Sequence, residues 1–128
     1  MAESEKITIN ASVVDLGQID LLVEQGFYSS RTDFIRTAVR SQLASHADVV
    51  RQTVTRKMAA LGVISYGAKD LEAVRRSGEK LDITVVGMLV FGEDVSPELA
   101  QATIRSLEVR GVFRASEAVK NALADRMK

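Results

Sequence analysis

The side chains best placed to do chemistry are three polar ones near the start of the chain, spaced two residues apart: Lys6, Thr8 and Asn10. They alternate with the apolar residues Ile7, Ile9 and Ala11. A period of two predicts a half-buried strand with one apolar and one polar face. The polar face offers an ammonium, a hydroxyl and a carboxamide, which donate or accept hydrogen bonds. We therefore look for function on this outward row.

Residue types that support covalent catalysis or metal binding are scarce. His46 is the only histidine and cysteine is absent, so a nucleophilic triad or a cysteine-ligated metal site has no components. Ser96 and Ser116 precede helical stretches and are interpreted as helix caps. The glycines form no nucleotide-binding pattern. We predict that the protein is not an enzyme and uses no metal and no cofactor.

Composition predicts one domain or two small ones. The chain has 128 residues, of which 46% are hydrophobic and only 5% aromatic, so a packed core must be aliphatic. No run approaches the roughly 18 apolar residues of a membrane span. The segment Met1–Glu5 lacks the basic and apolar blocks of a signal peptide. We expect a cytoplasmic protein with no membrane partner.

Net charge does not indicate a nucleic-acid partner, because the chain carries 17 basic and 17 acidic residues. Residues 1–45 hold four basic and six acidic side chains, a net charge of −2. A domain of this charge that binds DNA has to use a local basic face rather than its total charge.

Two helices are predicted to follow the strand. The first covers residues 13–25, capped by Ser12 and ended by Gly26, which suits a left-handed residue. The second begins after Ser30, with Asp33 at the acidic third position of a capping box. Its apolar residues are expected to form a buried stripe, made of Phe34, Ile35, Ala38, Val39 and Leu43. A lone strand leaves its backbone groups unpaired. The strand is therefore expected to pair with a copy of itself from a second chain.

This order of elements resembles the ribbon-helix-helix regulators of the Arc, MetJ and CopG type, most closely the CopG-like branch. The matching pieces are Lys6-Ile7-Thr8-Ile9-Asn10, the corner at Gly26, and the run from Tyr28 to Arg36. The likeness covers about residues 5–44. It implies a symmetric dimer whose antiparallel two-stranded ribbon enters the major groove of double-stranded DNA.

The resemblance also implies site residues. Base contacts fall on the outward ribbon positions Lys6, Thr8 and Asn10, and phosphate contacts fall on Ser29, Ser30 and Arg31 at the start of the second helix. Lysine can donate to a guanine edge, asparagine can pair with an adenine edge, and threonine can touch a thymine methyl. Each residue has a simpler explanation: Thr8 and Asn10 can be a solvated strand face, and Ser30 caps a helix with or without DNA. The family often has a more basic ribbon than this one.

The chain beyond residue 45 is predicted to contain a linker helix and then a repeat. Apolar residues spaced three or four apart predict a helix over 46–58, which could be an extension of the second helix. Gly62, Gly87 and Gly111 then recur at intervals of 25 and 24 residues, each inside an apolar strand pattern that a helix follows. A period of this length in strand–helix units predicts parallel strands in a short solenoid-like array.

Three glycine-centred strands set the expected core. Residues predicted to lie between sheet and helices are Ile83, Val85, Leu89, Val109 and Phe113. A glycine inside a strand usually marks a bend or a close approach of backbone. No family is recognised for this half, and its weak first repeat suggests an exposed strand edge that could pair with another subunit.

The predicted fold class is α+β, with a ribbon-helix-helix domain in residues 1–45, a linker helix in 46–58 and a β/α-repeat domain in 59–128. The predicted function is a sequence-specific DNA-binding transcriptional regulator, homodimeric through the ribbon, whose repeats form a higher oligomer or bind a protein partner. One alternative is an antitoxin whose second half binds a toxin. The other is an architectural or segregation protein that coats DNA.

Overall fold

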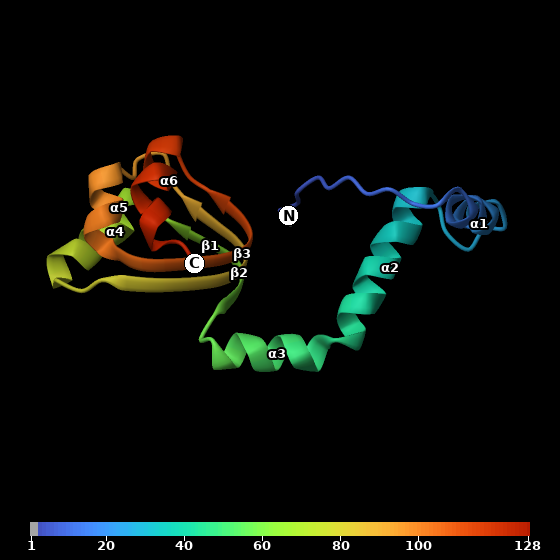
Figure 1. The fold of residues 1–128 in the computed structure, drawn as a ribbon, viewed down its shortest axis with the longest axis horizontal. Helices are drawn as coiled ribbons and strands as arrows, with labels where there is room; N and C mark the ends of the chain where they lie inside the picture. The colour runs from blue at the N-terminus through green and yellow to red at the C-terminus, as the bar shows by residue number, and fades with distance from the viewer. Residues whose placement is uncertain (1–2) are drawn as a thin grey trace. The chain divides into compact units, whose positions relative to one another are not determined.

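The computed structural model describes residues 3–128 and divides the chain into two compact units, Ser4–Gln52 and Thr53–Lys128 (Figure 1). Over the described residues the chain forms six α-helices and three strands. The mixed helix and strand content agrees with the predicted fold class at this coarse level. Each unit is best understood by itself, because the two bury their apolar residues differently.

The first unit contains α1, Val13–Glu24, and α2, Arg31–Ser45. The predicted caps are present: the Ser12 hydroxyl oxygen accepts a hydrogen bond from the Asp15 N–H at 3.0 Å. Gly26 has a φ of +86°, so it ends α1 in the left-handed conformation that glycine tolerates. Residues 3–12 carry no helix or strand in the single chain. The intertwined ribbon therefore stays a prediction.

A third helix, α3, spans Ala47–Arg56. It is not continuous with α2, because His46 between them has a φ of −113° and a ψ of 16°, outside the helical range. The chain therefore bends at its only histidine, whereas the sequence suggested that the two helices could be one.

The second unit alternates strands and helices. Its elements are β1 (Ala60–Tyr66), α4 (Ala68–Ser77), β2 (Leu81–Phe91), α5 (Pro97–Thr103), β3 (Ile104–Arg114), α6 (Glu117–Leu123) and a 3₁₀ turn (Ala124–Arg126). The strands form one parallel sheet in the order β1-β2-β3, as predicted for the repeats. Helix α5 is short and ends at Thr103, because Ile104 already pairs with Leu81 of β2.

The helices α4, α5 and α6 lie together against one face of the sheet (Figure 1). The core between the two layers is mainly aliphatic, with Phe91 as its one buried aromatic residue among those described. The predicted core residues Ile83, Val85 and Leu89 are buried. Val109 and Phe113 are half-buried and pack against them.

The register of the sheet follows the sequence repeat. Gly62 pairs with Gly87, and Gly87 pairs with Gly111, so the residues aligned by the repeat are neighbours in the sheet. The predicted close approach of backbone at the second and third glycines is confirmed by the spacing described below. The solenoid-like array stays a prediction, since the described strands form one short sheet.

Neighbouring β/α units satisfy each other's helix ends. The Asp94 carboxylate, which follows β2, accepts a hydrogen bond from the Ala68 N–H at 3.2 Å and so caps α4 of the preceding unit. Arg126, which follows α6, donates to the carbonyl oxygens of Gln101 and Ile104 at the end of α5, at 2.5 and 2.9 Å. These bonds tie α4 and α5 to the unit that follows each of them.

Candidate nucleic-acid interface

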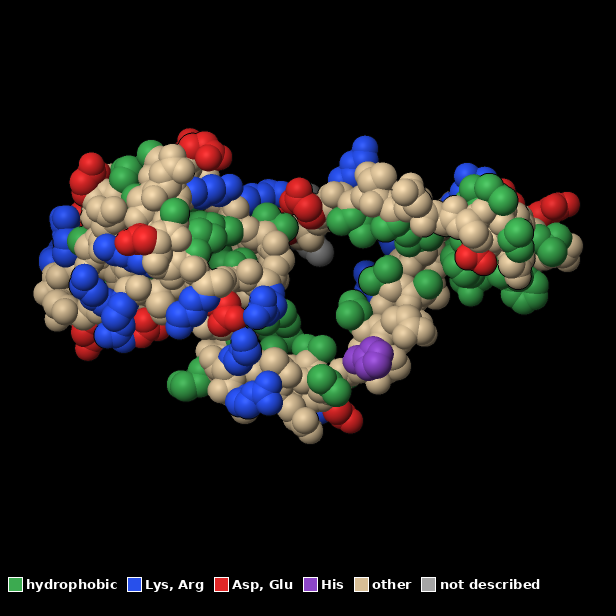
Figure 2. All heavy atoms as spheres, in the orientation of Figure 1, with side chains coloured by type: hydrophobic (Ala, Val, Ile, Leu, Met, Phe, Trp, Pro, Cys, Tyr) green, Lys and Arg blue, Asp and Glu red, His purple; other side chains and the backbone are tan. Residues whose placement is uncertain are grey.

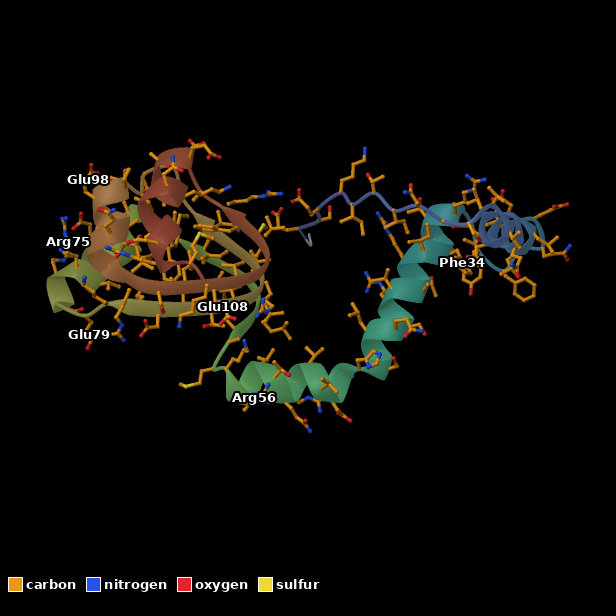
Figure 3. All side chains as sticks on the ribbon, in the orientation of Figure 1. Phe34, Arg56, Arg75, Glu79, Glu98 and Glu108 are labelled. Atoms are coloured by element: carbon orange, nitrogen blue, oxygen red, sulfur yellow. The ribbon has the colours of Figure 1, made fainter. Side chains whose placement is uncertain are left out.

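The predicted base-reading residues lie in the extended segment before α1. Lys6, Thr8 and Asn10 are all exposed. The apolar residues between them are exposed as well, Ile7 at 78% and Ile9 at 63% of their surface. Side chains stand out on both sides of this segment in Figure 3. The single chain thus leaves both faces of the segment uncovered, the apolar one included.

An apolar groove of about 960 Å³ lies in the same unit, between the extended segment, α1 and α2. Its lining includes Ile9 and Ala11 from the segment, Leu16, Ile19 and Leu22 from α1, and Phe34, Ile35, Ala38, Val39 and Leu43 from α2. Hydrophobic side chains over these helices are visible from outside in Figure 2.

The apolar stripe of α2 is not covered within one chain. Helix α2 has no buried residue there, and Val39 and Leu43 are 49% and 61% exposed. Ile19 is the only buried side chain in α1. The reason is that two helices cannot enclose a stripe of this width by themselves.

Arg31 is held by an acidic partner that sequence reasoning missed. Its Nε and Nη2 atoms donate to the two carboxylate oxygens of Asp20 in α1, both at 2.7 Å. Hydrogen bonding and the charge of Arg31 lower the pKa of Asp20 below its ordinary value of 3.8. The forked pair fixes the start of α2 against α1. The two residues are eleven positions apart, so no local pattern signals the pair.

The start of α2 is organised by serine and aspartate. The Ser30 hydroxyl oxygen accepts from the Asp33 N–H at 3.0 Å, which confirms the predicted cap. The Asp33 carboxylate accepts from the N–H of Ser29 at 2.9 Å rather than from the N–H of the capping residue itself. The N–H groups of Arg31 and Thr32 lie in the first turn, where a helix offers them no carbonyl partner.

An aromatic pair supports this corner. The rings of Tyr28 and Phe34 meet edge to face, with 5.0 Å between centroids, a favourable geometry for two aromatic rings. Phe34, labelled in Figure 3, projects from the first turn of α2. The pair helps to fix the loop that carries Ser29 and Ser30. The contact between Phe34 and Tyr28 was not predicted from the sequence.

Other functional chemistry is sparse in the described residues. Across residues 3–128, no three His, Cys, Asp or Glu side chains gather as a metal site would require. Asp70 and Asp94 both serve the start of α4, since Asp70 accepts from the Gly67 N–H at 2.7 Å. Within the same range, none of the helices combines the length and the apolar character needed to span a bilayer.

An extended segment with alternating faces, two capped helices and an apolar groove between them are the parts of a DNA-binding unit of the ribbon-helix-helix class. The chain belongs to the ribbon-helix-helix transcriptional regulator family, which matches residues 2–120. The predicted resemblance is therefore confirmed, and it extends through the repeats, which the sequence analysis left unassigned. No curated protein and no solved structure is significantly similar to the chain.

Membership in this family defines the broad function. The protein is a DNA-binding transcriptional regulator, and regulators of this family dimerise and are typically not enzymes.

Proposed function

We propose that the protein acts as a homodimer that recognises a specific DNA sequence through a two-stranded ribbon built from residues 5–12 of both chains. The observation that carries this proposal is the open apolar groove of the Ser4–Gln52 unit. An apolar surface of this size on a small unit is a liability in water unless another surface covers it. The apolar face of the extended segment needs cover for the same reason.

A second copy provides that cover with the same residues. Two segments that pair in antiparallel fashion satisfy each other's backbone groups and turn Ile7 and Ile9 to one face. A two-stranded ribbon is only marginally stable alone, so it requires packing against helices. The apolar stripes of α1 and α2 supply this packing across the two-fold axis.

The opposite face of the ribbon then presents Lys6, Thr8 and Asn10 twice. A ribbon of two strands fits the major groove of B-DNA, where each base pair shows a distinct pattern of donors and acceptors. The lysine ammonium suits guanine, the asparagine carboxamide suits adenine, and the threonine methyl suits thymine.

The start of α2 anchors the backbone of the DNA. The first-turn N–H groups after Ser30 point out of the helix and attract a phosphate oxygen, which the helix dipole also favours. Arg31 uses its Nε and Nη2 to hold Asp20, and its guanidinium carries further N–H donors for a phosphate. Ser29 completes the anchor from the preceding loop. These contacts position the dimer without reading the sequence.

The test compares Thr8→Ala and Asn10→Ala with Thr55→Ala, a control at an exposed threonine of α3. Footprinting on the native upstream region and titration of a short duplex measure affinity, while light scattering counts chains. Each ribbon variant should weaken specific binding roughly 5- to 150-fold, from about 1–3 kcal/mol per base contact, and remain dimeric. Wild-type affinity in both ribbon variants would contradict the assignment of Thr8 and Asn10 as base contacts.

The same experiment separates the alternatives. Protection of one inverted repeat supports a regulator, whereas uniform, salt-sensitive coating of unrelated DNA supports the architectural alternative. The antitoxin alternative is less favoured because antitoxin tails commonly gain order only on binding. Here Thr53–Lys128 has a buried aliphatic core of its own.

A further inference from the structure

The parallel sheet of the second unit has two outer edges. In the order β1-β2-β3, each outer strand pairs with β2 alone. On the β3 side, a bridge between Leu107 and Met127, with the Lys128 N–H donating to the Leu107 carbonyl at 2.8 Å, covers only the start of the strand. Among the described residues, no strand lies beside β3 from Val109 to Arg114 or beside the outer side of β1.

The three paired glycines share an unusual backbone conformation. Gly62, Gly87 and Gly111 have φ angles of +136°, +135° and +126°, in the range that side-chain-bearing residues rarely adopt. A Cβ placed on Gly87 would lie 2.1 Å from the Gly62 carbonyl oxygen. A Cβ placed on Gly111 would lie 2.0 Å from the Gly87 carbonyl oxygen. Each of these two glycines therefore leaves room for the carbonyl of the preceding strand.

The two outer edges of the sheet lack this contact between a glycine and a neighbouring carbonyl within one chain. A Cβ placed on Gly62 would meet no atom within 4 Å, so the space that a preceding carbonyl would fill is open. The φ of Gly111 is close to that of Gly87, whose carbonyl oxygen lies toward Gly111 of β3. A Gly111 carbonyl with the same orientation points away from β2, toward the open edge of the sheet. One edge has the recess and the other has the oxygen that fits it.

We propose that β3 of one copy pairs in parallel with β1 of a second copy, with Gly62 beside Gly111 and the Gly111 carbonyl in the recess at Gly62. The register of this contact continues the one inside the chain. It places Val63 beside Val112 of the neighbouring copy, and Ile64 beside Phe113. The strand that pairs with β3 comes from a second copy. It needs a glycine opposite Gly111, and β1 carries Gly62 on its unpaired side.

Exposure of β1 supports the pairing. Leu61 and Val63 of the outer strand β1 are 64% and 55% exposed. The residues that pair with them in the central strand β2 are Val86, which is half-buried, and Met88, which is buried. A further strand beside β1 would cover these two side chains in the same way and remove apolar surface from water.

This contact joins unlike surfaces, so it adds copies in a series instead of closing a pair. It links ribbon dimers to one another and thereby deepens the oligomerisation role predicted for the repeats. It rests on that proposed role but not on the assignment of Lys6, Thr8 and Asn10 as base-reading residues.

The first test measures mass against protein concentration by sedimentation and light scattering, on the full chain without DNA. Wild type should form species larger than two chains that grow with concentration. Val63→Lys should reduce them to two chains, because it places a charge on the strand edge, close to Arg110 and Arg114 of the neighbour. Val49→Lys, at a valine of α3 that is 62% exposed, should assemble as wild type does.

The second test fixes the register and exploits the absence of cysteine in the chain. Val63→Cys and Val112→Cys chains are mixed and treated with a short bismaleimide. The mixture should yield the mixed cross-link, and each variant alone should yield little. A strong cross-link in Val63→Cys alone would indicate β1 paired with β1 and would overturn the proposal, as would a wild type confined to two chains at every concentration.

Binding to a duplex with one site, measured on the same variants, separates this proposal from the proposed DNA recognition. Val63→Lys should bind such a duplex within about twofold of wild type, since it leaves the ribbon unchanged. If assembly fails while the duplex is bound normally, only the edge pairing is wrong. If binding is lost in Thr55→Ala as readily as in Asn10→Ala while assembly persists, only the ribbon assignment is wrong.

Discussion

The two compact units contain similar aliphatic residues, which are buried in one unit and largely exposed in the other. In Thr53–Lys128, residues such as Leu71, Leu89 and Leu107 are fully buried between a sheet and its helices. In Ser4–Gln52, Ile19 alone is buried and the α2 stripe lies open. The difference teaches that the second unit can reach a stable fold from its own contacts. In the proposed dimer the first unit gains its stability from a second chain, so its folding should depend on concentration.

The largest expected effect is in the closed core. Leu89→Ala should lower the free energy of unfolding by about 2–5 kcal/mol, because it leaves a cavity where a side chain is fully buried. Urea denaturation of the second unit, followed by circular dichroism, measures this loss. Met58→Ala, at a position that is 89% exposed, serves as the control and should change it by roughly 0.5 kcal/mol or less. Equal losses in both variants would mean that the core is misassigned.

The paired glycines Gly62 and Gly87 allow the edge of the sheet to be compared with its interior. Gly62→Ala should cost about 1–3 kcal/mol through its positive φ alone. Gly87→Ala should cost more, because its Cβ also meets the Gly62 carbonyl at 2.1 Å. Urea midpoints of the two variants give the order directly. An order reversed from this one would contradict the steric account of the paired glycines.

The open groove predicts a concentration-dependent loss in the first unit. Val39→Ala should weaken the dimer by about 1–2 kcal/mol, since a valine covered on association loses its apolar contacts. Dilution series by analytical ultracentrifugation, on a Val63→Lys background that removes edge pairing, should show dissociation at higher concentration than in the parent. The unfolding of Thr53–Lys128 should be unchanged. A shift in that transition instead would mean that the units share a core.

The smallest expected effect is electrostatic. Arg31 lowers the pKa of Asp20 in the folded state below its ordinary value of 3.8. The ion pair therefore stabilises the fold above that pH, and the contribution disappears as the pH falls through the lowered folded-state pKa. An NMR titration should find the Asp20 carboxyl ionised below pH 3.8, and Arg31→Gln should raise its pKa. An unchanged value in this variant would mean that Arg31 is not its partner.

Local patterns in the sequence predicted much of the fold. Ser12, Ser30 and Gly26 mark helix ends through their own backbone chemistry, so each could be recognised without tertiary information. The repeat of glycines predicted the pairing of strands, because parallel neighbours built from equivalent units align equivalent residues. The family could be recognised from residues 5–44 for the same reason.

What the sequence did not reveal depends on partners distant along the chain. The pair of Asp20 with Arg31 joins two helices and leaves no periodic trace. The α2 stripe was expected to be buried because periodicity shows that a face is apolar, but not which chain covers it. The predicted base and phosphate contacts stay predictions for the same reason, since their partner is a second molecule.

The bonds between successive β/α units have a consequence for the order of folding. The start of α4 is completed by Asp94 after β2, and the end of α5 is completed by Arg126 after α6. A chain that leaves the ribosome therefore lacks these caps until the following unit has emerged. The early units should stay partly frayed, and cooperative structure should appear late, when the last helix docks.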